Sequence, residues 1–199
     1  EIKAYYEIAK VDDTDTTFNN NSNNNPDIFS LKGNNALGYE FYTPFQTRWD
    51  NRDYNAPDGA YSSILIVATQ NNTNIRVNSP YEIARQSGGN YPANTDIFIT
   101  LDKGETYKLT PKREGGTDVI SDAAGDRLRG TYIQVTNNKP IAVTIGDDSG
   151  KKDGPYDYIG DQLVPLFNIN GDPVVGKQYI VMRGQVQDDT GGERCFILA

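Results

Sequence analysis

The sequence predicts an all-β protein, folded as an antiparallel β-sandwich of jelly-roll or related type. Short apolar runs that alternate with polar residues recur along the chain, separated by turns rich in Asn, Gly and Asp. Such a pattern is typical of half-buried strands. No segment keeps a long apolar period of about 3.6 residues, so we expect no helix longer than about three turns. The chain has 199 residues, enough for one substantial core, and we expect a single sandwich unit over 1–199.

The first part of the chain predicts a strand, a long loop and a second strand. Residues 2–9 alternate loosely between apolar and polar side chains, as a half-buried strand does. Residues 12–27 are polar and rich in Asn. They contain too little apolar surface to order themselves strongly, so we expect a loop there. Leu37, Tyr39 and Phe41 then fall on one face of the next strand.

The middle of the chain predicts a buried strand and three hairpins. The run at 61–69 contains Ile, Leu, Ile and Val in succession, which indicates a strand covered on both faces. Three pairs of neighbouring apolar runs are each separated by a short turn signal, and we expect each pair to form a hairpin. These turn signals lie at 70–72, 102–104 and 137–138.

Two more apolar runs, at 179–182 and 195–198, complete the predicted strands. The stretch 193–199 faintly resembles residues 61–68. It either closes the present sandwich, which we favour, or opens a following repeat. An unpaired apolar edge promotes aggregation, so we expect residues 195–198 to pair with another strand.

The segment 139–166 carries a dense cluster of carboxylates. An apolar run leads into an expected loop that contains Asp147, Asp148, Asp153, Asp157 and Asp161. Carboxylates this close repel one another unless cations, water or backbone N–H groups satisfy them. Oxygen ligands suit Ca²⁺, so four of these residues form a candidate calcium site: Asp147, Asp148, Asp157 and Asp161. In the alternative interpretation they are turn and cap residues bonded to nearby N–H groups. We expect residues 160–165 to form a structural turn, because Gly and Pro punctuate them.

The same segment carries a resemblance to a known family. The resembling stretches are Lys139-Pro140-Ile141-Ala142-Val143-Thr144, Asp147-Asp148-Ser149 and Tyr156-Asp157-Tyr158-Ile159-Gly160-Asp161-Gln162-Leu163-Val164-Pro165. Residues 31–47, 61–69 and 103–107 add to them. In this order they resemble the bacterial branch of the IgGFc-binding protein N-terminal domain family, over residues 28–199.

The resemblance implies a secreted or cell-surface β protein of a bacterium, of the kind found in Bacteroidetes. Relatives often have Cys where this chain has Pro155, so a disulfide expected at that position is absent here. The family takes its name from an antibody-binding protein of animals, and the resemblance does not extend that activity to the bacterial branch.

The charge of the chain limits the classes of partner that it can bind. The formal net charge is −8. A nucleic-acid partner is therefore disfavoured, because such binders need a basic stripe to displace counterions. Anionic membrane surfaces are disfavoured for the same reason. The sequence has no apolar run of the roughly 18 residues that a spanning helix needs, so no membrane insertion is expected. The first residue is Glu1 rather than Met, which suits a mature secreted protein or a trimmed chain.

Residue usage argues against common catalytic systems. The chain has no His and a single Cys, so Ser-His-Asp and Cys-His nucleophile systems and imidazole-based zinc sites are excluded. Cys195 stands beside Phe196 and Ile197, which favours a buried, inert thiol. Paired carboxylates leave glycoside hydrolysis as an alternative, although the sequence cannot supply their separation.

Aromatic residues in loop-like segments are the best candidates for a binding surface. Exposed Trp and Tyr side chains stack on sugar rings or anchor protein partners, whereas packing beneath loops is the alternative role. The candidates are Trp49, Tyr42, Tyr54, Tyr156 and Tyr158. We therefore expect a non-enzymatic, extracytoplasmic module of a larger surface protein, acting in adhesion or recognition of a protein or glycan ligand. A carbohydrate-binding module is the first alternative and a glycoside hydrolase is the second.

Overall fold

The computed structural model describes residues 4–8, 27–44, 62–85, 87–112, 128–151, 156–174 and 176. These residues form β-strands and one short 3₁₀ helix. The elements are β1 (Ala4–Ile8), β2 (Asp27–Leu31), η1 (Gly33–Ala36), β3 (Glu40–Tyr42), β4 (Ser62–Ala68), β5 (Thr73–Asn78), β6 (Ile83–Ala84), β7 (Asn90–Tyr91), β8 (Asp96–Leu101), β9 (Thr106–Leu109), β10 (Tyr132–Val135), β11 (Ile141–Lys151) and β12 (Tyr156–Gln162).

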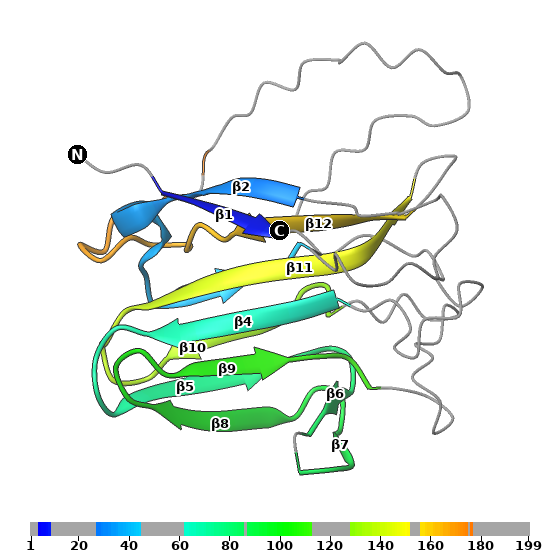
Figure 1. Ribbon diagram of the computed structural model, residues 1–199. Coiled ribbons are helices and arrows are strands. Elements are labelled where there is room, and N and C mark those ends of the chain that lie inside the picture. Colours follow the sequence, from blue (N-terminus) through cyan, green and yellow to red (C-terminus); the bar gives the residue numbers. More distant parts are fainter. Residues whose placement is uncertain are drawn as a thin grey trace.

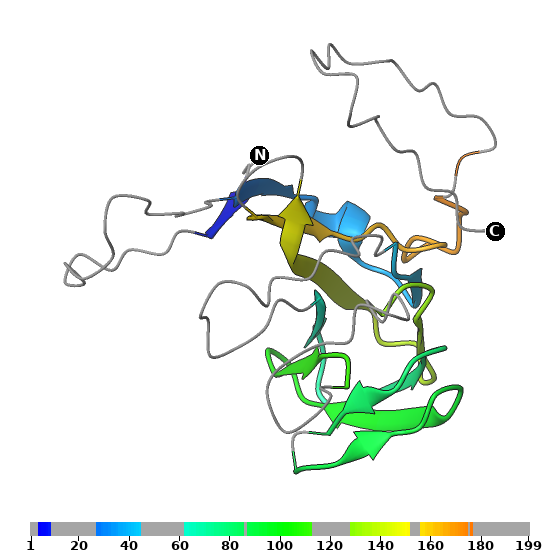
Figure 2. The same ribbon diagram turned by 90° about the vertical axis from the view of Figure 1, so that its right-hand side faces the viewer.

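Two antiparallel four-stranded sheets face each other and form the sandwich (Figures 1 and 2). One sheet has the order β3–β10–β5–β8 and the other the order β12–β11–β4–β9. The hairpin of β1 and β2 lies beside β12, at the end of the molecule opposite β8 (Figure 1). The all-β antiparallel sandwich that the sequence predicts is confirmed. No helix among the described residues is both long and apolar enough to cross a membrane.

The core lies between the sheets because alternate residues of each strand point inward. In β4 and β5 every second side chain is buried, so Ile64, Ile66, Ile75 and Val77 have no more than 1% exposure. Their neighbours Leu65 and Val67 are only half-buried on the outer face. The expectation of a strand covered equally on both faces is therefore only partly met. The core extends through Phe41, Ala68, Ile83, Ile97, Ile99, Leu101, Leu109, Leu128, Ile133, Val135, Ile141, Val143 and Leu163.

The three predicted hairpins are wrong. Each turn carries the chain from one sheet to the other, since β4 and β5 lie in different sheets, as do β8 and β9, and β10 and β11. The turn signals were read correctly as turns, because Asn72, Gly104 and Asn138 have positive φ angles of 52, 84 and 57°. We call a turn that joins strands of two different sheets an arch. Residues with positive φ permit a sharp change of direction in an arch as well as in a hairpin.

The three arches lie side by side at one end of the sandwich, the left-hand end in Figure 1. The backbone N–H of Asn72 donates to the Asp102 carboxylate at 2.7 Å, and the Asn137 amide donates to the Asn72 carbonyl at 2.7 Å. Lys139 Nζ donates to the carbonyls of Asn71 and Asn72 at 2.8 and 3.0 Å. Side chains of each arch thus satisfy the backbone of its neighbour, which fixes the order of the strands.

The expected aspartate loop is largely a hairpin of two strands. Asp147 and Asp148 belong to β11, and Asp157 and Asp161 belong to β12. The two strands pair with a register shift between Asp147 and Gly150. Residues 160–162 continue β12, so the turn predicted at 160–165 is wrong for that half. The many Gly and Asp residues of this segment interrupt the apolar–polar alternation that would otherwise have indicated two strands.

The chain after β12 runs along the edge of β3 that does not pair with β10. Leu166 N–H donates to the Glu40 carbonyl at 2.8 Å, and Gly38 bridges to both Ile141 and Asn168. Gly38 therefore lies where the two sheets and the later segment meet. A Cβ atom there would approach Pro165 Cβ to 2.3 Å and the Phe167 carbonyl oxygen to 2.7 Å. No side chain larger than hydrogen fits without movement.

Candidate functional site

The outer face of the β3–β10–β5–β8 sheet gathers the exposed aromatic and polar residues of four strands. Phe41, Ile133, Val77 and Ile97 point into the core, so the alternate residues of the same strands point outward. The outward-facing residues are Glu40, Tyr42, Tyr132, Gln134, Asn74, Arg76, Asn78, Asp96, Phe98 and Thr100.

The strand register arranges these side chains in rows across the sheet. In one row Tyr42 pairs with Tyr132, Tyr132 with Asn78, and Asn78 with Asp96. In the next row, Glu40, Gln134, Arg76 and Phe98 stand opposite one another in the same way. Aromatic groups lie at one side of the first row and a carboxylate at the other.

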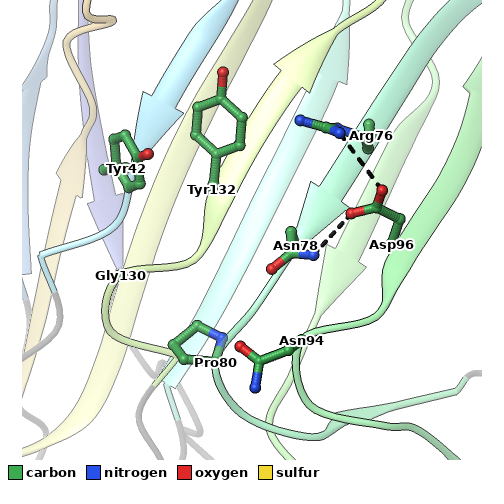
Figure 3. Close-up of a pocket in the computed structure, with 8 residues that line it drawn as sticks. All are labelled: Tyr42, Arg76, Asn78, Pro80, Asn94, Asp96, Gly130 and Tyr132. Carbon is green, nitrogen blue, oxygen red and sulfur yellow. Dashed lines mark hydrogen bonds and ion pairs between the residues drawn. The ribbon is translucent and has the colours of Figure 1, made fainter.

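A pocket of about 330 Å³ opens on this face, next to the first row (Figure 3). Its lining comes from four strands and the turns next to them: Tyr42, Arg76, Asn78, Pro80, Asn94, Asp96, Gly130 and Tyr132. The Asn78 amide donates to Asp96 Oδ1 at 2.7 Å, and Arg76 Nη1 lies 3.5 Å from Asp96 Oδ2. These contacts hold the Asp96 carboxylate at one side of the pocket.

Aromatic rings form the opposite wall of the pocket. The centroids of Tyr42 and Tyr132 are 4.8 Å apart with an interplanar angle of 35°. The Arg76 guanidinium carbon lies 5.8 Å from the centre of the Tyr132 ring, within the range of a cation–π contact. Tyr42 is 44% exposed and Phe98, one row away, is 74% exposed. The face thus presents apolar surface to solvent beside fixed polar groups.

The Tyr132 hydroxyl is held in its neutral, donating form. It donates to Glu40 Oε2 at 2.9 Å. Burial, the hydrogen bond to Glu40 and the negative charge of Glu40 together raise the pKa of Tyr132 to about 12, against a lowering by Arg76. The neutral hydroxyl is favoured because an ionised phenolate next to a carboxylate would be repelled.

The rim of the pocket is fixed by buried hydrogen bonds. Asn94 N–H donates to the Ser79 carbonyl at 2.7 Å, and the Thr131 hydroxyl donates to Ser79 Oγ at 3.0 Å. Gly130, with φ of 71°, places its N–H 2.8 Å from the Thr43 carbonyl. Because Ser79, Thr131 and Thr43 are buried, these bonds hold the turns on either side of the pocket in place.

Of the aromatic candidates from the sequence, the structure places Tyr42 in this site. Trp49 and Tyr54 lie outside the described residues. Tyr156 and Tyr158 belong to β12 of the other sheet, and their side chains lie outside the described part. These four remain predictions.

Among the aspartates, Asp161 has a cation partner within the protein. Lys32 Nζ lies 2.7 Å from both oxygens of the Asp161 carboxylate and also bonds the Gln162 carbonyl. The pair is partly exposed, so it contributes about 0–1 kcal/mol. The side chains of Asp147, Asp148 and Asp157 lie outside the described part. The residues with described side chains contain no cluster of three or more metal-ligating groups. The calcium site therefore stays a prediction.

Sequence reasoning missed most of the pocket. Arg76, Asn78, Asp96 and Tyr132 stand at alternate strand positions and look like ordinary solvent-facing residues. They meet only because β5 pairs with both β8 and β10. The alternation could have identified them as outward-facing, but the strand order that joins them is not readable from one sequence.

Comparison with known proteins adds a family. No curated protein and no solved structure matches the chain. A family model described as IgGFc binding protein matches residues 27–197, which is most of the chain and includes every strand of both main sheets. The chain therefore belongs to the IgGFc-binding protein family.

Proposed function

We propose that the chain is a non-enzymatic recognition module of a larger extracytoplasmic surface protein, acting in adhesion or ligand binding. Its binding surface is the outer face of the β3–β10–β5–β8 sheet. The family description supports a protein ligand. The resemblance of the sequence to secreted bacterial proteins supports the setting outside the cell, and a glycan is the other ligand class that we consider.

One observation carries this proposal. Phe98 is 74% exposed on that face, beside Arg76 and close to the row that contains Tyr42 and Tyr132. Tyr and Arg are enriched at the energetic centres of interfaces, and an exposed Phe buries a large apolar area when a partner covers it.

The composition of the pocket favours binding over catalysis. A glycoside hydrolase uses two carboxyl groups on either side of the scissile bond. The residues that line the pocket include a single carboxylate, Asp96, and its oxygens already accept from Asn78 and Arg76. The chain also has no His to serve as a general base.

A carbohydrate-binding module is the second candidate. The observation that favours it is the meeting of two tyrosine rings with a fixed carboxylate and amide in one pocket. Sugars offer both an apolar face and hydroxyl groups, so they suit such a mixed lining.

The test of the proposed function is direct binding by the full chain. The family description makes an IgG Fc fragment the first protein probe, and a printed glycan array covers the second ligand class. We expect binding in at least one panel, and we expect Phe98→Ala to weaken it about tenfold or more. Phe98 is exposed, so its loss leaves the core intact, which the melting temperature checks.

The matched control is Phe167→Ala. Phe167 is 41% exposed, but it lies in the segment after β12 and is not among the residues that line the pocket. Its loss should leave the affinity unchanged. Absence of binding in both panels, or equal losses in the two variants, would contradict the proposed function.

A further inference from the structure

The side of the pocket formed by Asp96 and Asn78 can form hydrogen bonds with neighbouring hydroxyl groups of a ligand. Each oxygen of the Asp96 carboxylate has a second lone pair beyond the contacts with Asn78 and Arg76. The Asn78 amide keeps one N–H and its carbonyl oxygen. An acceptor and a donor side by side match two adjacent hydroxyls, since a hydroxyl donates one hydrogen bond and accepts another.

The wall of the pocket can take the apolar side of the same ligand. The exposed ring of Tyr42 presents its negative π face, and the C–H groups of a sugar ring carry a small positive charge. Stacking requires a ring held in position. The Tyr132 ring 4.8 Å away supports Tyr42, and the bond from Tyr132 to Glu40 holds that second ring.

The charge of the lining selects among sugars. The lining contains one cation and one anion, Arg76 and Asp96, which face each other. Their charges offset, so the pocket offers no net attraction to a carboxylate, sulfate or ammonium group. The chain as a whole carries a net charge of −8 and repels anions. Anionic ligands are therefore disfavoured, and a neutral ligand suits the offset charges of the lining.

The pocket is also organised before any ligand arrives. Buried bonds at Ser79 and Thr131 fix the turns that carry Pro80, Asn94 and Gly130 at its rim. A ligand consequently loses little affinity to the ordering of protein groups.

From these four observations we propose that the pocket binds a neutral oligosaccharide, one ring of which stacks on Tyr42 while adjacent hydroxyls of the neighbouring ring bond to Asp96 and Asn78, because Tyr42 and Asp96 stand three strands apart in the row. This inference rests on the proposed function, because it assigns a ligand class to the same face of the sheet.

The experiment uses the full chain and an array of neutral and sialylated glycans. Isothermal titration follows, with the free oligosaccharide of the best-bound glycan. We expect binding of a neutral oligosaccharide. Asp96→Asn, which keeps the shape but turns one acceptor oxygen into a donor, should weaken binding at least tenfold. Tyr42→Ala should do the same, and Tyr42→Phe should restore binding because it keeps the stacking ring. Phe167→Ala serves again as the control.

The outcomes separate this inference from the proposed function. Binding of the Fc fragment that Phe98→Ala weakens, with no glycan bound, would overturn the sugar site and leave the recognition face standing. Binding restricted to sialylated glycans, or a Tyr42→Ala variant that binds sugar as well as the wild type, would also overturn it. Unchanged melting temperatures in the variants rule out loss of fold as the cause.

Discussion

Tyr132 donates a hydrogen bond to the Glu40 carboxylate at 2.9 Å, across the ladder that joins β10 to β3. The contact is diagonal, since Tyr132 stands opposite Tyr42 and Glu40 stands opposite Gln134. It links the row that lines the pocket to the row that contains Phe98. The protonation of one hydroxyl therefore bears on both parts of the face.

We predict that this bond makes stability fall at high pH. The folded pKa of Tyr132 is about 12, above the ordinary 10.0, so the unfolded chain loses this proton first. The stabilising contribution is complete below pH 10 and is lost as the pH rises toward 12. Urea unfolding of the wild type and of Tyr132→Phe measures it, and the variant should show the shallower decline across that window. Parallel declines in both proteins would contradict the assignment.

A companion substitution tests the cause of that pKa. Glu40→Gln keeps an oxygen acceptor but removes the charge, so the pKa of Tyr132 should move back toward its ordinary value. The measurement is the ultraviolet titration of the variant, compared with a Tyr132→Phe, Glu40→Gln double variant to isolate the one phenol. A titration of Tyr132 identical to that of the wild type would show that burial alone sets the pKa.

Gly38→Ala should destabilise the sandwich by about 1–3 kcal/mol, the usual range for overpacking. The added Cβ would lie 2.3 Å from Pro165 Cβ and 2.7 Å from the Phe167 carbonyl oxygen, and backbone atoms yield little. Urea midpoints of the wild type and the variant measure the loss. Pro165→Gly removes one of the clashing groups, so the double variant should lose less than the sum of the single losses. A variant as stable as the wild type would mean that the later segment moves away freely.

The arches make a separate prediction. Asn137 accepts from Asn74 N–H at 3.0 Å and donates to the Asn72 carbonyl at 2.7 Å. Asn137→Ala removes both bonds and should cost about 1–3 kcal/mol. Gln70→Ala is the matched control, because Gln70 is an exposed residue of the neighbouring arch. Equal unfolding midpoints for the two variants would show that the side-chain bonds between arches contribute nothing.

Calcium provides the last prediction. Any rise in melting temperature with calcium should depend on Asp147 and Asp148, because Asp161 already has the Lys32 ammonium group at 2.7 Å. Scanning calorimetry with calcium and with chelator, on the wild type and on an Asp147→Asn, Asp148→Asn variant, decides this. Asp172→Asn is the control. A rise that survives the double substitution would place the ion elsewhere, and no rise in the wild type would favour turn and cap roles.

The sequence was sufficient to predict where the strands lie but not which strands pair with one another. Alternation identified β5 and β8 because Ile75, Val77, Ile97 and Ile99 must all leave water. The same alternation is present whether two strands share a sheet or face each other across the core. Asn72 with its positive φ suits either geometry, so the sequence pattern predicts hairpins where the structure has arches.

The candidate site shows the same limit. Tyr42 could be found because it is an aromatic residue beside a loop-like segment, outside a clear core pattern. Asp96 and Asn78 gave no such signal. Their 2.7 Å contact depends on the register of β5 against β8, which a single sequence does not contain. The Asn-rich residues 12–27 are almost entirely outside the described part, and residues 193–199 are entirely outside it, so those two predictions stand as they were made.

The arches have a consequence for the order in which the chain can fold. Strands that follow one another through an arch never pair, so the ladders of the two main sheets join distant segments. In the described ladders, β4 pairs with β9 and β11, and β3 pairs with β10, all of which come later in the chain. During synthesis, which begins at the N-terminus, no ladder of either main sheet can form before residues 96–101 are made and pair with β5. Such non-local pairing belongs to the slow range of folding, on the order of milliseconds to seconds. The strands β3, β4 and β5 of the main sheets are therefore synthesised before the strands with which they pair.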